Sequence, residues 1–246
     1  MSKLHYIRKG TGQNKILLIH GNVASANWWG PTMDSLQDKY DCIAVDLRGY
    51  GQSVAGSKTV TIALHAQDIM ETLEDMKFYP FVVVGHSLGG AVAMELAKTY
   101  PDRINKLVLV DSAQLQGLGD YDCAALEPIV ANPSLLKMAL QATFFQPMPV
   151  QLADVLMEDC VRAKDAFIPN TKALMQTNYT SDAPKFFKPV LVIRGEQDKV
   201  IPLVEAEKIA AAYPHSTMVS IPKCGHNPPL EATEIFSKTL TEFIEQ

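Results

Sequence analysis

Short runs of consecutive apolar residues recur along the chain, separated by stretches in which apolar residues return every three or four positions. The runs lie at 15–20, 41–45, 81–84, 106–110 and 189–193, with a weaker example at 216–221 and a weakly alternating edge strand at 4–8. Strands that are apolar at every position are typical of parallel sheets with helices on both faces. This pattern predicts a mostly parallel sheet.

The stretches with helical spacing complete the pattern. We expect helices at 61–77, 88–100, 203–213 and 229–244. The second ends just before Pro101 and the third just before Pro214, and proline cannot continue a helix. Strands that alternate with helices in this way predict an α/β fold with a doubly wound, mostly parallel sheet and right-handed crossovers.

One long segment, 112–187, departs from this alternation. It contains no convincing buried strand, and its helix-like patches lie at 135–140 and 150–161. We interpret it as a helical insertion over one end of the sheet. The expected domain organisation is therefore a core in two parts, 1–111 and 188–246, separated by the insertion at 112–187.

Composition limits the function classes. The net charge of −5 argues against nucleic acid or an anionic membrane as the main partner, because both require clustered positive charge. No apolar run is long enough for a membrane span. The four cysteines are widely spaced, which favours buried free thiols over a zinc site or disulfides. With no apolar run at the N-terminus, a cytoplasmic location is expected.

The strongest chemical motif is GHSLGG at 85–90, which follows one apolar run and opens an Ala-rich helix. It is a G-x-S-x-G motif in the strand–turn–helix context that the motif requires. A sharp turn lifts the serine hydroxyl clear of the sheet, and bulky side chains two residues away on either side would clash. The helix start offers free N–H groups to a developing oxyanion. We therefore predict Ser87 as a nucleophile, against the alternative of a glycine-rich packing turn.

A serine nucleophile needs a base. His226 lies in the loop KCGHNPP (223–229), between the last expected strand and the last helix. Loops at the carboxyl ends of strands are where α/β sheets place their sites. His86 adjoins Ser87, but neighbours in so tight a turn would point apart. His226 is the predicted base; the alternative is a loop histidine that only binds backbone.

The base needs an acid that orients it. Asp198 follows the apolar run at 189–193, and the chain order Ser87, Asp198, His226 is the order of nucleophile, acid and base expected for this arrangement. Asp111 is the rival acid and Glu196 a weaker one. A turn or capping role is the alternative for Asp198.

An oxyanion hole is predicted from two backbone N–H groups. The glycine of His-Gly-Asn (20–22) lets the backbone approach a substrate oxygen closely. The N–H of Asn22 would pair with that of Leu88, and Val23 is the neighbouring possibility.

Together these segments resemble the α/β-hydrolase superfamily, in its serine-nucleophile, esterase-like branch. The matching landmarks, in order, are HGN (20–22), DLRGYGQS (46–53), GHSLGG (85–90), RGEQD (194–198) and GHNPP (225–229). The resemblance implies that 46–53 is a structural loop beside the site, and that the insertion is the helical cap that covers the pocket and sets specificity. Ser87 distinguishes the chain from dehalogenases and epoxide hydrolases, which use an aspartate.

The expected reaction is two-step acyl transfer on carboxylic esters of small or medium apolar groups, with no metal or cofactor. The partner is a small molecule with an acyl group. The same triad also fits a thioesterase, an amidase, a carbon–carbon bond hydrolase, a perhydrolase or a slow-turnover ligand receptor. A pocket is predicted at Val23, Trp28, Met138, Phe144 and Phe145. The alternative for the cap residues among them is that they pack the cap onto the sheet.

Overall fold

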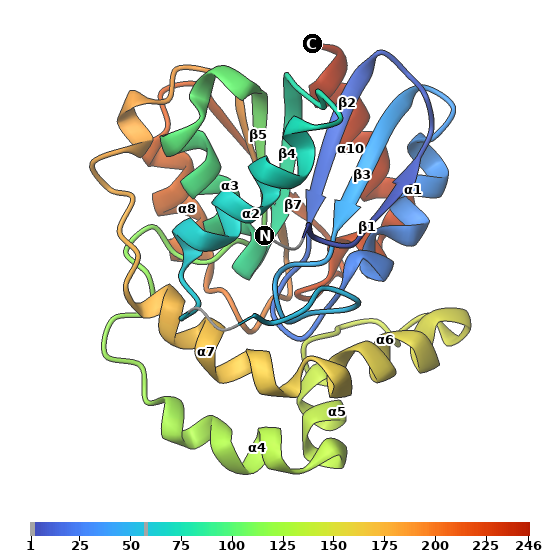
Figure 1. Cartoon of the computed structure of the whole chain (residues 1–246), viewed down its shortest axis with the longest axis vertical. Helices are drawn as coiled ribbons and strands as arrows, with labels where there is room; N and C mark the ends of the chain where they lie inside the picture. The colour runs from blue at the N-terminus through green and yellow to red at the C-terminus, as the bar shows by residue number, and fades with distance from the viewer. Residues whose placement is uncertain (1–2, 57–58) are drawn as a thin grey trace.

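The computed structural model describes residues 3–56 and 59–246, and its centre is one seven-stranded sheet (Figure 1). The strand order is β1-β3-β2-β4-β5-β6-β7, in which β1 and β3 pair antiparallel and the other described pairs are parallel. The predicted doubly wound, mostly parallel sheet is confirmed. The strands are β1 (Tyr6–Lys9), β2 (Asn14–Ile19), β3 (Tyr40–Val45), β4 (Phe81–His86), β5 (Ile104–Val110), β6 (Val190–Gly195) and β7 (Ser216–Ile221).

Both faces of the sheet are covered, which explains the consecutive apolar runs. Leu17 and Ile19 of β2 join one hydrophobic cluster with residues of α2, α3 and α8. Ile16 and Leu18 of the same strand join a second cluster with residues of α1 and α10. Successive side chains of a strand therefore enter opposite layers of core. The covering helices are α1 (Gly30–Leu36), α2 (Ile62–Glu74), α3 (Leu88–Thr99), α8 (Leu203–Ala212) and α10 (Thr233–Glu245).

The helix ends follow local chemistry. The Thr61 hydroxyl accepts the N–H of Leu64 at 3.0 Å and caps the start of α2. One expectation about the helices is wrong, and one helix was not predicted. The helix predicted at 229–244 is divided into α9 (Pro228–Glu231) and α10, because the backbone of Ala232 leaves the helical region at φ −142° and ψ 45°. Helix α1, which begins with Gly30 and Pro31, was not predicted.

Four helices lie between β5 and β6, and Figure 1 shows them gathered at one end of the sheet. Their inner side chains form a third hydrophobic cluster, in which Leu136, Leu140 and Leu156 pack with Trp28 and Leu230 of the remaining chain. We refer to this group as the cap helices. They are α4 (Glu127–Ala131), α5 (Pro133–Gln141), α6 (Val150–Arg162) and α7 (Lys164–Met175).

Buried polar contacts also join the cap helices to the rest of the chain. The carboxylate of Asp159 in α6 accepts hydrogen bonds from Ser25 Oγ at 2.5 Å and Asn27 Nδ2 at 2.9 Å. In α7, Asn170 Oδ1 lies 2.6 Å from Nε2 of the buried His65 in α2. Buried polar groups need such partners, so each contact fixes the position of a cap helix relative to the sheet.

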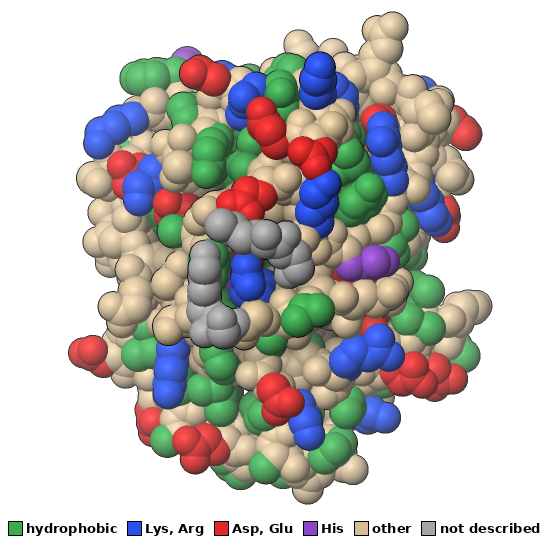
Figure 2. Space-filling view, in the orientation of Figure 1, with side chains coloured by type: hydrophobic (Ala, Val, Ile, Leu, Met, Phe, Trp, Pro, Cys, Tyr) green, Lys and Arg blue, Asp and Glu red, His purple; other side chains and the backbone are tan. Residues whose placement is uncertain are grey.

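The surface in Figure 2 carries Lys and Arg side chains interspersed with Asp and Glu, over both the sheet region and the cap helices. Within the described ranges, no helix combines the length and the apolar character that crossing a bilayer requires. The four cysteines, Cys42, Cys123, Cys160 and Cys224, are free and buried, as expected.

Candidate active site

Ser87 occupies the turn between β4 and α3, in a backbone conformation that non-glycine residues rarely adopt. Its φ is 52° and its ψ is −117°. A Cβ on Gly85 would lie 2.2 Å from the carbonyl oxygen of Gly89, and a Cβ on Gly89 would lie 2.3 Å from the carbonyl oxygen of Ile19. The two glycines therefore allow the close approach that the strained turn requires.

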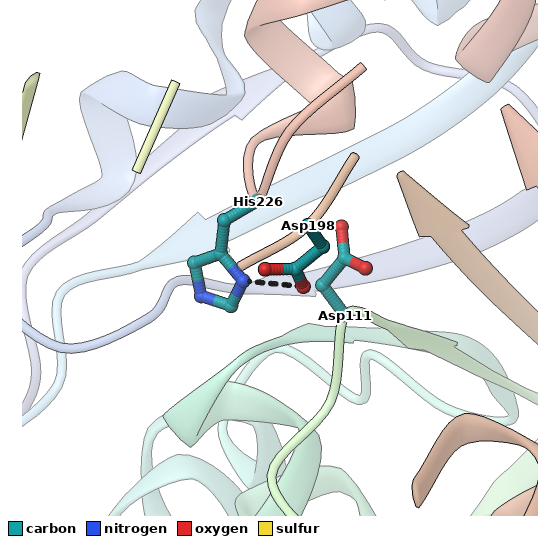
Figure 3. Close-up of side chains that lie close together, drawn as sticks. All are labelled: Asp111, Asp198 and His226. Atoms are coloured by element: carbon teal, nitrogen blue, oxygen red, sulfur yellow. Dashed lines mark hydrogen bonds and ion pairs between the residues drawn. The ribbon is translucent and has the colours of Figure 1, made fainter. Parts of the chain in front are cut away.

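His226 and Asp198 meet at the carboxyl end of the sheet, from the loops after β7 and β6. Figure 3 shows the two side chains facing each other, with His226 Nδ1 2.9 Å from Asp198 Oδ2. The other oxygen of Asp198 accepts the N–H groups of Val200 at 2.7 Å and Ile201 at 3.2 Å. Although burial opposes it, the hydrogen bond and the charge of His226 lower the pKa of Asp198.

Asp111, the rival acid, lies on the side of Asp198 opposite His226 in Figure 3. It follows β5 with φ 38°, is 2% exposed, and accepts the N–H of Gly195 on both oxygens, at 3.0 and 3.2 Å. Burial, followed by the charge of Asp198, raises the pKa of Asp111 well above its usual range. The side chain that contacts His226 Nδ1 is thus Asp198. The third candidate, Glu196, is exposed.

Two other histidines support the loops around this pair. The Nε2 of His86 lies 2.7 Å from the carbonyl oxygen of His226. Burial lowers the pKa of His86 to about 3, so the ring is neutral and donates this hydrogen bond. His20 accepts the N–H of Leu47 on Nε2 at 3.0 Å, which leaves Nδ1–H to donate to the Gly21 carbonyl at 2.7 Å. Burial also lowers the pKa of His20.

A cavity of about 390 Å³ is bordered by two of the three predicted catalytic side chains, Ser87 and His226. Within the described residues, Ser87 Oγ makes no hydrogen bond to His226, but both side chains line this cavity. Such contacts are often long in free enzymes and tighten when substrate binds. The lining is Asn22, Val23, Trp28, His86, Ser87, Leu88, Ala113, Gln114, Leu118, Tyr121, Leu126, Leu136, Ala139, Leu140, Thr143, Phe167, Thr171, Leu174, Val200, Ile201, His226 and Asn227.

The residues predicted for an oxyanion hole lie in this lining. Leu88 is the first residue of α3, where the backbone N–H has no acceptor within the helix. Asn22 is held from two directions: the Tyr50 hydroxyl donates to its Oδ1, and its Nδ2 donates to Thr171 Oγ1 of α7 at 3.2 Å. The loop at 46–53 thus supports Asn22 through Tyr50.

The five predicted pocket residues lie in different places. Val23 and Trp28 line the cavity. Phe144 packs against Trp28, with ring centroids 6.2 Å apart, and borders a separate groove of about 810 Å³ between α5 and α6. Phe145 borders the same groove and is 50% exposed, and Met138 is 62% exposed. The structure therefore does not bring these last three together with Ser87.

Glu231 is a site residue that the sequence analysis missed. Its carboxylate accepts four backbone N–H groups, from Phe145 at 2.7 Å, Gln146 at 2.9 Å, Gly225 at 3.0 Å and Asn227 at 3.0 Å. It therefore connects the loop that carries His226 to the segment after α5. Glu231 follows Asn227, the N-cap of α9, by four residues rather than the three of a capping box, so the sequence carries no standard signal for it.

Asp111, Asp198 and His226 also place one potential metal ligand each within 4.8 Å of one another. Carboxylates and imidazoles are both common metal ligands. Here, however, His226 Nδ1 already contacts Asp198, and Asp111 accepts the Gly195 N–H. Each of the three side chains therefore already has a hydrogen-bond partner within the protein.

Comparison with known proteins identifies the fold independently. A family model described as the alpha/beta hydrolase fold matches residues 14–233. The chain is 30% identical to the dihydrolipoyllysine-residue acetyltransferase component of an acetoin cleaving system from Cupriavidus necator, over 98% of this chain and 66% of that longer protein. It is 23% identical to a putative esterase/lipase from Haemophilus influenzae, over 99% of this chain and 88% of the relative.

A further relative and a solved structure complete the comparison. A 2-hydroxy-6-oxononadienedioate/2-hydroxy-6-oxononatrienedioate hydrolase from a Pseudomonas species is 24% identical, over 98% of this chain and 91% of the relative. The enol-lactonase from Burkholderia xenovorans superposes with a TM-score of 0.88 at 20% identity, covering 99% of this chain and 96% of that one. At this identity the structural match shows the fold alone.

Proposed function

The chain belongs to the alpha/beta hydrolase fold family, and on this basis we propose that it is a serine hydrolase that cleaves carboxylic esters of small or medium apolar groups. One observation carries the proposal. The strained turn at Ser87 and the side chain of His226 border the same cavity, and Asp198 contacts His226 from behind at 2.9 Å. Nucleophile, base and acid in that arrangement are the components of acyl transfer.

In the proposed mechanism, His226 takes the proton of Ser87 as the serine oxygen attacks the ester carbonyl. The oxyanion of the tetrahedral intermediate accepts hydrogen bonds from the N–H groups of Leu88 and Asn22. Collapse expels the alcohol, which receives the proton from His226 and leaves an acyl group on Ser87. His226 then activates a water molecule that releases the acid, while Asp198 keeps the imidazole in the required tautomer.

The lining of the cavity supports an uncharged substrate. Its described side chains include no Lys, Arg, Asp or Glu, and most are apolar. A substrate carboxylate bound there would lose its hydration without gaining a cationic partner, which is costly. Esters with apolar acyl and alcohol groups therefore fit the cavity better than the dicarboxylate that the name of the Pseudomonas hydrolase specifies.

We propose further that the segment 112–187 acts as a cap, which gives the core its predicted division into 1–111 and 188–246. This is supported by the side chains that the cap helices contribute to the cavity. Leu136 and Leu140 come from α5, and Phe167, Thr171 and Leu174 come from successive turns of one face of α7. The cap would therefore set the shape of the substrate site.

Covalent labelling tests the proposed nucleophile. A fluorophosphonate should react at Ser87 alone, and peptide mapping would identify the modified residue. Prior incubation with a short p-nitrophenyl ester should slow the labelling, since both compounds compete for the same oxygen. Labelling at another serine, or hydrolysis of the ester by a fully labelled protein, would refute the assignment.

A further inference from the structure

Two buried carboxyl groups lie close together behind His226, and the proposed mechanism uses only one of them. Asp111 is 2% exposed, and the Asp198 side chain is fully buried. An oxygen of each carboxyl group lies within 4.8 Å of an oxygen of the other. Since two ionised carboxylates repel each other at this separation and each has lost its hydration, a proton is required between them.

The surrounding donors indicate which of the two is ionised. Asp198 accepts three N–H groups, from the His226 ring and from the backbone of Val200 and Ile201. Asp111 accepts one, the N–H of Gly195, which its two oxygens share. Hydrogen bonds from N–H donors favour the charged form of a carboxyl group, so the better supplied Asp198 is the anion.

The other titratable groups near the pair do not change this assignment. The Arg194 guanidinium, on the neighbouring strand end, donates to the Glu196 carbonyl at 3.3 Å rather than to either carboxyl group. Burial and the charge of Asp198 outweigh its charge, so the pKa of Asp111 stays raised. Cys224 is buried, and burial raises its pKa, so it is a neutral thiol. His86, behind His226, is neutral as well. His226 contacts Asp198 directly, which adds to the preference for a negative charge there.

We propose that Asp111 is a positioning residue that carries a proton and donates it to Asp198, thereby fixing the carboxylate that faces His226. The proposal rests on the roles proposed above for His226 and Asp198. Asp198 is then held by donors on both sides, by His226 in front and Asp111 behind. The pair presents one negative charge to the imidazole rather than two.

The variant Asp111→Asn tests whether Asp111 is protonated or ionised in the parent protein. An asparagine can accept the Gly195 N–H through its oxygen and donate to Asp198 through its amide, and asparagine tolerates the positive φ at this position. We expect kcat/KM for a p-nitrophenyl ester within about threefold of the parent value, because the donor and the charge are both conserved. The acid limb of the pH profile, where protonation of the base stops the reaction, should stay within about 0.3 pH unit.

If Asp111 were ionised, the same substitution would remove a negative charge within 4.8 Å of the imidazole. The acid limb would then move to lower pH by about one unit or more. That shift would overturn the proposal. Asp111→Ala, which removes the donor, should lower kcat by about tenfold or more with little change in KM, because Asp198 loses one of its supports. Equal kcat values for the Asn and Ala variants would also overturn it.

An infrared measurement remains decisive if Asp111→Ala does not fold. The parent protein should show the carbonyl stretch of a buried carboxylic acid near neutral pH, and Asp111→Asn should lack it. Asp159→Asn is the matched control, at another buried aspartate, and should keep the band. A band that persists in Asp111→Asn refutes a protonated Asp111. If the proposed serine hydrolase function is itself wrong, the parent protein will neither react with the fluorophosphonate nor hydrolyse the ester.

Discussion

The two walls of the central cavity are built by different physical means. The wall on the sheet side carries Ser87, Leu88 and His226, and local backbone geometry and buried hydrogen bonds fix each of them. The wall on the cap side consists mainly of apolar side chains, such as Leu140 and Phe167, whose positions depend on how whole helices pack. A small displacement of an atom in the first wall should lower the reaction rate, whereas the apolar side chains of the second wall can repack around a small change. Reactivity should therefore respond sharply to changes in the sheet wall, and specificity to changes in the cap wall.

Replacement of the proposed nucleophile should have the largest effect. Ser87→Ala is expected to reduce kcat/KM for p-nitrophenyl esters by about 10⁵-fold or more, since the covalent step is lost. The melting temperature should not fall, because the hydroxyl makes no described contact that the fold needs. Ser112→Ala, at another buried serine close to this turn, should retain nearly full activity and serves as the control. Comparable losses in both variants would show that the turn, rather than the hydroxyl, matters.

Replacement of Asp198, the proposed acid that contacts His226, should have the next largest effect. Asp198→Asn is expected to lower kcat by about 10⁴-fold, because an amide favours the wrong tautomer of the imidazole. Glu196→Gln, two residues earlier in the same loop but exposed, should change kcat by less than about twofold. Steady-state kinetics on both variants measure the contrast. A large loss at residue 196 together with a small one at 198 would reassign the acid.

Glu231 lies where the two walls meet, so its replacement should affect both reactivity and stability. In Glu231→Gln, an amide NH₂ would face some of the backbone N–H groups that the carboxylate now accepts. We expect kcat to fall by about tenfold and the melting temperature to drop by about 4 °C or more. Glu234→Gln, at an exposed glutamate in α10, should leave both unchanged. A normal kcat in Glu231→Gln would show that the His226 loop does not depend on this carboxylate.

The same contrast between the walls explains which features the sequence could predict. The sheet followed from its apolar runs, because buried strands need apolar residues on both faces. The proximity of Asp198 to His226 followed from their places after two strands and from the chain order. Helix α1 was missed because Gly30 and Pro31 are poor helix signals, although Pro31 fits a first helical turn. Glu231 was missed because its partners come from segments far apart in the chain.

The cap wall was predicted least well, and α5 shows why. Leu135, Leu136, Met138 and Leu140 are all apolar, so composition alone does not show which side of this helix faces inward. The packing of Trp28 and Leu230 against Leu136 and Leu140 settles it, and that is a contact between distant segments. The predicted pocket therefore included Met138, which is 62% exposed, and omitted Leu140, which is 5% exposed.

Substitutions in α5 should give the smallest effect on rate and the clearest effect on specificity. Leu140→Ala enlarges the cavity, so the ratio of kcat/KM for an octanoate ester to that for a butyrate ester should rise by about tenfold. Ala139→Leu, which narrows the same cavity without removing core contacts, should lower that ratio. Met138→Ala, on the outer side of the same helix, should leave the ratio unchanged and is the matched control.

Leu140→Ala also lowers the free energy of unfolding by about 2–5 kcal/mol, so the assays should be run well below the melting temperature of this variant. If Met138→Ala shifts the chain-length preference while the two cavity variants do not, the acyl group binds outside this cavity, near the groove between α5 and α6.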